Sequence, residues 1–302
     1  MHWAILALLS AAVFGVVSII DKHLVDRIVQ NFRALLFILG VMGVLICIPF
    51  IIAEPSYSGY SAKALAAALG SGLTRGVAMS LTFWVLRREE VSRALPVTMT
   101  YPIFVAILAA VFLDENLGIW EWASIFVIVA GAILLSARRA PGALGGFLLG
   151  SSFFLLVLSS FSGGLSNFLG KIALDEISTV QVFTINLFFI GVTVLVMSTS
   201  RTAIRGAWEI VRERPRHLPW FAADMLVALL GTYLLFSAFD VGPVSGAAAL
   251  NATRPMFIFL YVVALSLLAP RFMYESLSGR ALTIKFVAIV MIVAGTGRLV
   301  AG

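Results

Sequence analysis

Charged side chains stand inside long apolar stretches of this sequence at three places. Arg254 lies near the middle of one stretch, directly before Pro255, Arg75 lies near the middle of another, and Asp224 lies in the first half of a third. In a hydrocarbon environment a charge costs about 2.5–3.5 kcal/mol, so such a side chain normally faces a cavity or a partner. These three residues are the first candidates for binding a charged ligand, or for pairing with one another.

Tyr101 occupies the position in the first half of the chain that Arg254 occupies in the second. Tyr101 precedes Pro102 just as Arg254 precedes Pro255, and we expect the two side chains to face each other. Proline removes a backbone hydrogen bond from a helix, so Pro102 and Pro255 predict a helix break or hinge at this level. Arg254 could instead be held by helix carbonyls or by an acidic neighbour.

Three further side chains are candidates for the same site. Thr98 and Asn251 lie one helical turn before Tyr101 and Arg254 and could supply neutral hydrogen bonds. Trp84 could line the cavity, although polar and aromatic residues in membrane bundles also serve helix packing and interface anchoring.

The pairing of the charges decides which ligand such a site would accept. Arg75 and Asp224 lie in corresponding helices of the two halves, so we expect them to meet across the seam, as a functional or a purely structural ion pair. Two arginines without carboxylate partners would form an anion site. One arginine paired with Asp224 would leave a smaller site suited to a zwitterion.

Other kinds of chemistry have weak support in the sequence. His2, His23 and His217 lack the spacing of metal ligands, and no glycine loop followed by Lys-Ser/Thr is present to cradle a phosphate. We therefore expect no metal, no cofactor, no direct use of ATP and no enzymatic activity. A lipid-modifying enzyme within the membrane would need a nucleophile or an acid/base pair, for which Asp224 alone is weak support.

The elements that position these residues must be membrane helices. The chain has 302 residues, of which 61% are hydrophobic and 12% charged, and its mean hydropathy is +1.05. Soluble domains carry far more charge, and apolar runs of helix length in lipid must satisfy their backbone internally. The net charge of +6 then reports membrane topology rather than nucleic-acid binding.

Ten helices are expected, and they fall into two copies of one unit. The segment from Val91 to Pro102 returns as Val244 to Pro255, in the same order as other matches along the chain. We place the repeats at 1–140 and 141–302, with five helices each, so the two copies must enter the membrane from opposite sides. The expected helices are 2–20, 33–53, 63–86, 92–113, 118–136, 146–170, 178–199, 218–238, 244–268 and 281–299.

The loop cations predict an orientation. Lys63, Lys171 and Arg298 fall on one face, whereas most other loop cations fall on the opposite face. That opposite face holds Lys22, Arg27, Arg33, Arg87, Arg88, Arg93, Arg138, Arg139, Arg201, Arg205, Arg212, Arg214, Arg216, Arg271 and Arg280. The positive-inside rule places this second face in the cytoplasm and both termini outside. The long polar loop, roughly 200–217, holds five arginines, and its helix-like stretch 203–213 could lie along the membrane surface.

The chain resembles the EamA-like drug/metabolite transporters. In the first half the resemblance rests on Lys22, Ser92, Ala94, Pro102, Glu115 and Gly131. In the second half it rests on Lys171, Ser245, Ala247, Pro255, Glu275 and Gly295. It implies a substrate carrier with a central cavity and alternating access. It also implies both termini inside the cell, whereas the charge bias favours the outside.

We therefore expect a secondary transporter in a prokaryotic inner membrane, exporting a small carboxylate-bearing metabolite such as an amino acid. Coupling to protons or to a counter-substrate is possible, and the partners are the substrate and the lipid bilayer, not nucleic acid. The alternative is an exchanger of phosphorylated or nucleotide-linked sugars, which more than one unpaired cation would favour. A lipophilic-cation pump is less favoured because no acidic residue lies mid-helix in helix 1 or 6. A scaffold would leave the cost of Arg254 unexplained.

Overall fold

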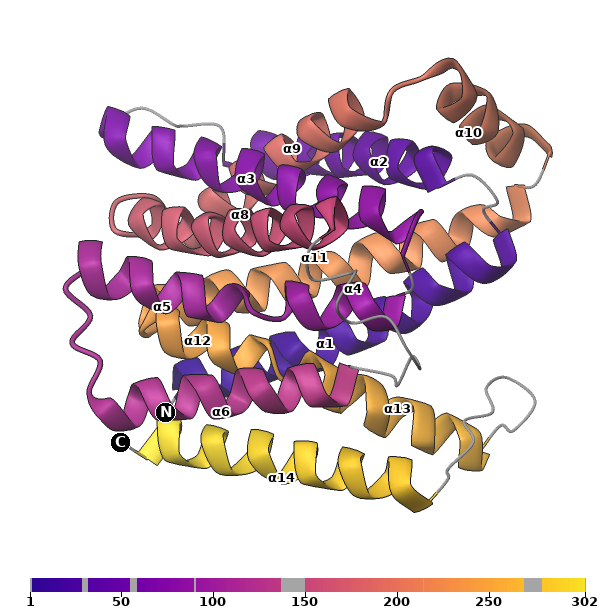
Figure 1. The fold of residues 1–302 in the computed structure, drawn as a ribbon. Coiled ribbons are helices and arrows are strands. Elements are labelled where there is room, and N and C mark those ends of the chain that lie inside the picture. The colour runs from indigo at the N-terminus through magenta and orange to yellow at the C-terminus, as the bar shows by residue number, and fades with distance from the viewer. Residues whose placement is uncertain are drawn as a thin grey trace.

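The computed structural model describes residues 2–28, 32–54, 59–89, 91–136, 150–213, 215–268 and 279–301, and these ranges form a bundle of helices (Figure 1). Within them, ten spans are long and apolar enough to cross a membrane. The predicted all-helical fold with ten spans is confirmed, and the repeat boundary proposed between residues 140 and 141 lies outside the described ranges.

The two halves of the chain each supply five spans. The spans of the first half are α1 (His2–His23), α2 (Phe32–Ala53), α3 (Ala62–Leu86), the pair α4 (Val91–Thr98) and α5 (Tyr101–Phe112), and α6 (Ile119–Ser136). The spans of the second half are α8 (Ser151–Leu174), α9 (Thr179–Ser198), α11 (Leu218–Val241), the pair α12 (Val244–Asn251) and α13 (Arg254–Leu268), and α14 (Gly279–Ala301). Between the spans lie a π-helix (Leu24–Ile28), α10 (Arg201–Glu213) and a short 3-10 turn (Pro215–His217).

Helices α6 and α14 pack against each other through reciprocal contacts. A Cβ atom added to Gly131 of α6 would stand 2.8 Å from Ile292 Cγ1 of α14, and one added to Gly295 of α14 would stand 2.8 Å from Ile128 Cγ1 of α6. Only glycine permits so close an approach of the two backbones. The two matched glycines therefore hold equivalent helices of the two halves together.

Glu115, which follows α5, caps the first turn of α12. Its Oε1 atom accepts a hydrogen bond of 2.7 Å from the backbone N–H of Val244, and its Oε2 atom accepts one from the hydroxyl of Ser245. A carboxylate at this position satisfies N–H groups that the helix leaves unpaired and complements the helix dipole. The acidic residue and the serine that carry the resemblance thus form one contact between the halves, while Glu275, the matching acid, lies outside the described residues.

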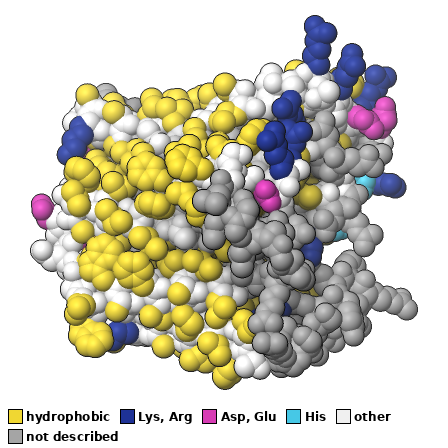
Figure 2. All heavy atoms as spheres, viewed as in Figure 1, with side chains coloured by type: hydrophobic (Ala, Val, Ile, Leu, Met, Phe, Trp, Pro, Cys, Tyr) yellow, Lys and Arg dark blue, Asp and Glu magenta, His cyan; other side chains and the backbone are white. Residues whose placement is uncertain are grey.

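Both termini lie at the same end of the bundle (Figure 1). Figure 2 shows dark-blue basic side chains gathered toward the opposite end. Hydrophobic side chains, in yellow, cover much of the rest of the coloured surface in this view. This opposite end, where α10 lies, is here called the basic end, and it holds Arg201, Arg205 and Arg212 of that helix. The distribution agrees with the charge bias read from the sequence.

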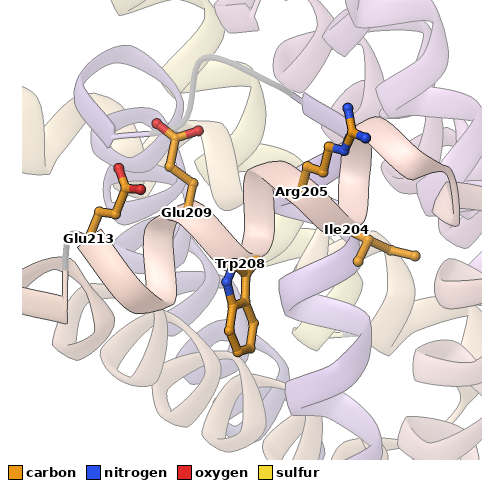
Figure 3. Close-up of a pocket in the computed structure, with 5 residues that line it drawn as sticks. All are labelled: Ile204, Arg205, Trp208, Glu209 and Glu213. Atoms are coloured by element: carbon orange, nitrogen blue, oxygen red, sulfur yellow. The ribbon is translucent and has the colours of Figure 1, made fainter.

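Helix α10 is amphipathic and packs on the bundle through one face. Ala203, Ala207 and Ile210 are buried, whereas Trp208 is 64% exposed. Figure 3 shows Trp208 projecting from one side of the helix and Glu209 from the other. An apolar edge of this kind beside arginines is typical of helices that lie in a membrane interface.

Candidate functional site

Two membrane spans are interrupted at matching positions in the two halves. Met99 and Thr100 separate α4 from α5, and Ala252 and Thr253 separate α12 from α13. The hydroxyl of Thr100 donates a bond of 2.7 Å to the carbonyl of Val97, three residues back, and the hydroxyl of Thr253 does the same three residues back in its own span, also at 2.7 Å. Each of these carbonyls also accepts a backbone N–H bond, of 3.2 Å from Thr100 and 3.1 Å from Thr253, so the interrupted backbone is hydrogen-bonded locally at both breaks.

Tyr101 and Arg254 open the second half of each interrupted span, one residue before Pro102 and Pro255. Proline at the first turn of a helix is favourable because its missing N–H would be unpaired there anyway. Each break therefore presents the side chain just before the proline at mid-span. Tyr101 and Arg254 also interact electrostatically with each other across the seam between the halves.

A chain of hydrogen bonds crosses this seam. The hydroxyl of Tyr101 lies 3.0 Å from Asn251 Oδ1 and 3.1 Å from the carbonyl of Ala248. The amide nitrogen of Asn251 donates to Ser10 Oγ at 2.9 Å, and that hydroxyl donates to the carbonyl of Gly231 at 2.7 Å. Four helices, α1, α5, α11 and α12, are joined by this chain, so the Tyr101 ring is held in a fixed position.

Arg254 extends toward α1 and is surrounded by polar groups of both signs. Its Nε atom donates to Ser18 Oγ at 2.8 Å, and its guanidinium lies 5.4 Å from the centre of the Phe14 ring. The carboxylates of Asp21 and Asp224 attract it electrostatically. Asp224 is only 4% exposed, and its Oδ1 atom is buried without a hydrogen-bond partner among the described residues.

Arg75 approaches the same region from α3. It donates a bond of 3.1 Å to Asn167 Oδ1 of α8, and it interacts electrostatically with Tyr101. Asn167 occupies the position in the second half that Ser18 occupies in the first, so each arginine binds an equivalent residue. The Nδ2 atom of Asn167 is buried and has no partner within the described ranges.

The structure separates some residues that the sequence suggested would meet. Asp224 interacts with Asp21 and Arg254, whereas Arg75 binds an amide, so the expected pair of Arg75 with Asp224 is not formed. The reason is which helices are neighbours: α3 packs against α8 and α9, whereas α11 packs mainly against α1. Ser10 Oγ donates to the carbonyl of Gly231 and Ser159 Oγ donates to that of Ala78, both at 2.7 Å. Ser10 and Ser159 occupy equivalent positions in the two halves, so these bonds show that Ala78 and Gly231 are also equivalent.

Seven residues earlier in each helix, Asp224 is therefore the equivalent of Ser71 and not of Arg75. Two other candidates also lie elsewhere. The Thr98 hydroxyl donates to the carbonyl of Leu95 within its own helix, at 2.9 Å. Trp84 is 39% exposed near the basic end, where the Arg88 guanidinium lies 4.2 Å from its ring centre.

Asp21 is the site residue that sequence reasoning missed. The apolar pattern predicts that the first helix ends at residue 20, which leaves Asp21 in a loop beside Lys22. The structure continues α1 to His23, and this extra turn brings the carboxylate of Asp21 into electrostatic contact with Arg254 and Asp224. The available signal was the helical spacing of three residues between Ser18 and Asp21.

The arrangement is a polar cluster at the seam with two unlike ends. At one end Arg254 faces two carboxylates, and at the other Arg75 faces Tyr101 and a neutral amide. Arg75, Tyr101 and Arg254 each keep part of their surface exposed although they lie near mid-span. Within the described ranges no group of three or more His, Cys, Asp or Glu residues is placed to hold a metal ion. The cluster offers charged and neutral groups that can bind a small ion or dipole.

Comparisons with known proteins point to transporters. The model of the EamA-like transporter family matches residues 1–137. A protein of Sinorhizobium sp named "Uncharacterized transporter in cobO 3'region" is 30% identical over 138 residues, which are 44% of this chain and 96% of that protein. A solved structure described as "Crystal structure of protein" superposes with a TM-score of 0.68 at 15% identity, covering 98% of this chain and 96% of the other. At this identity the structural likeness shows the all-helical fold alone.

Proposed function

The chain belongs to the EamA-like transporter family, and we propose that it exports a small carboxylate-bearing metabolite, such as an amino acid, as a secondary transporter. Membership in this family makes it an integral membrane transporter. The substrate class, the direction of transport and the mechanism are our proposal. It rests mainly on the polar cluster at the seam between the two halves.

The charges of the cluster support a substrate with one carboxylate and one cationic group. Arg254 already faces Asp21 and Asp224, whereas Arg75 binds only the neutral side chain of Asn167 and faces Tyr101. A substrate carboxylate would therefore bind at Arg75 and the Tyr101 hydroxyl. An ammonium group would be attracted toward the two carboxylates, since an unpaired buried carboxylate is costly and gains from a cation.

Alternating access would use the two interrupted spans. Inverted units that rock against each other need places where helices bend around a fixed site. The breaks before Pro102 and Pro255 lie at the level of Tyr101 and Arg254, so a change of angle there would move each half without moving the binding groups far. Coupling to a proton or to a counter-substrate would use the same carboxylates.

The exchanger of phosphorylated or nucleotide-linked sugars is less well supported. A phosphate of two negative charges would favour two arginines without carboxylate neighbours. Arg254 has two such neighbours, Asp21 and Asp224. The net charge around the cluster is therefore too small for a strongly anionic substrate.

Efflux from proteoliposomes tests this function directly. Vesicles containing the purified protein would be loaded with radiolabelled amino acids, sugar phosphates or organic cations. We expect efflux of an amino acid, and we expect Arg75→Gln to reduce it about 10- to 100-fold, because a hydrogen bond to a charged group is worth about 1.5–3 kcal/mol.

Arg88→Gln is the matched control, because Arg88 packs on Trp84 at 4.2 Å and not on the cluster. It should leave efflux unchanged. Efflux of sugar phosphates alone, or full amino-acid efflux by folded Arg75→Gln protein, would contradict the proposal.

We also infer that the chain resides in a prokaryotic inner membrane with both termini outside. The basic end would then face the cytoplasm, in line with the positive-inside rule. A protease-sensitive tag at the C-terminus should be cleaved from outside intact cells. Protection of the tag until the cells are lysed would show the opposite orientation.

A further inference from the structure

A pocket lies at the basic end of the bundle, apart from the polar cluster. It has a volume of about 360 Å³ and is lined where α2 begins and where α3 and α9 end. Pockets of this size accept small organic ligands. Its lining contains neither Arg75, Tyr101 nor Arg254, so the proposed function gives it no role.

The walls of the pocket are apolar and aromatic. Phe32 of α2 and Phe83 of α3 bring their ring centres within 5.0 Å of each other, and Leu36 and Met197 extend the apolar surface. Trp84 stands at the open side, 39% exposed. Tryptophan at the end of a membrane span is typical of the level at which lipid headgroups begin.

Two arginines line the same pocket. Arg33 lies in the first turn of α2 and Arg87 caps the C-terminus of α3. Both therefore stand at span ends, at the headgroup level, while the apolar walls run into the span below them. Basic pockets between membrane helices at such a surface bind anionic lipid headgroups.

A buried hydroxyl completes the lining. Ser80 is 5% exposed, and its Oγ atom has no hydrogen-bond partner among the described residues. It lies about two helical turns before Arg87, or about 10 Å deeper along α3. A buried hydroxyl without a partner is costly, and a ligand oxygen at this depth would satisfy it.

We propose that this pocket binds one anionic phospholipid. Its phosphate lies between Arg33 and Arg87, an acyl chain lies along Phe32, Phe83 and Leu36, and an ester carbonyl accepts a hydrogen bond from Ser80. A free phosphate would use the arginines and leave the apolar walls bare, whereas a zwitterionic lipid would use the walls but bring a phosphate whose charge its own cation already offsets.

Lipid binding to the purified protein in detergent tests the proposal. Dioleoyl phosphatidylglycerol, dioleoyl phosphatidylcholine and inorganic phosphate would be titrated separately, and bound lipid counted by native mass spectrometry. We expect phosphatidylglycerol to bind most tightly. Replacing both arginines by glutamine should weaken that binding about 30-fold, at about fivefold for each arginine removed, and change phosphatidylcholine binding much less, because its choline cation offsets the phosphate charge.

Arg212→Gln is the control, because Arg212 lies in α10 at the basic end but does not line the pocket. It should not change binding. If the double variant fails to fold, Arg87→Gln alone, at an exposed helix end, should still weaken binding about fivefold. Equal binding of phosphatidylglycerol by folded Arg87→Gln and wild-type protein, or phosphate binding as tight as that of the lipid, would overturn the proposal.

Discussion

The partner of Asp224 is open to a direct thermodynamic test. We would combine Asp224→Asn with Arg254→Gln in one double-mutant cycle and with Arg75→Gln in another. The structure predicts that Asp224 couples to Arg254 and not to Arg75, since Asp224 interacts with Asp21 and Arg254 while Arg75 binds Asn167.

The magnitude of the coupling follows from the distances. Among the described residues no ion pair within 4.0 Å joins Arg254 to a carboxylate. At an effective dielectric constant of about 20, two charges 4 Å apart interact by about 4 kcal/mol, which is an upper limit here. We expect a coupling free energy of about 1–3 kcal/mol for Asp224 with Arg254 and less than about 0.5 kcal/mol for Asp224 with Arg75.

The single variants should differ in size, and the effect of Asp224→Asn should depend on whether Arg254 is present. Arg254→Gln should lower the free energy of unfolding by about 3–5 kcal/mol, because it leaves Asp21 and Asp224 buried without their cation. Asp224→Asn should cost little in the wild-type protein, since it removes an attraction to Arg254 and a repulsion from Asp21 together. In the Arg254→Gln background the same change should restore part of the stability.

Unfolding by SDS in mixed micelles, followed by tryptophan fluorescence, measures these free energies. Circular dichroism before titration checks that each variant is folded. A coupling near zero for Asp224 with Arg254, or a larger coupling for Asp224 with Arg75, would refute the arrangement of charges described above.

Three further outcomes are expected. Gly131→Ala should lower the free energy of unfolding by about 1–3 kcal/mol, because the new Cβ would meet Ile292. Gly297→Ala in α14 is the control and should not lower it, because nothing lies within 4 Å of a Cβ atom there. Equal effects of the two changes would contradict the close packing of α6 on α14. Trp208 fluorescence should be quenched by lipids brominated near the headgroup, and quenching only by soluble iodide would place α10 in water. Hydrogen bonds from Ser61 hold the pKa of exposed Glu176 below its ordinary 4.5, so this contact stabilises the fold above that pH and is lost as pH falls through the lowered pKa. Ser61→Ala should return the pKa toward 4.5 in an NMR titration, and an unchanged pKa would show that the contact is absent in solution.

The spans and the breaks in them could be read from the sequence. Apolar runs of helix length in a chain with so little charge can only be membrane helices, since no other structure satisfies the backbone in lipid. The prolines at 102 and 255 mark where spans four and nine are interrupted, because a proline N cannot donate a helical hydrogen bond. These features depend on local composition and hardly at all on which helices are neighbours.

The neighbours of each charge were decided only by the tertiary structure. The sequence placed Arg75 and Asp224 in corresponding helices, but no local pattern records which helices become neighbours. In the structure α3 packs against α8 and α9, whereas α11 packs mainly against α1, so the two side chains find different partners. The length of α1 was also undecided, because Asp21 and Lys22 look like the start of a loop. Packing carries the helix past them, and this brings Asp21 to Arg254.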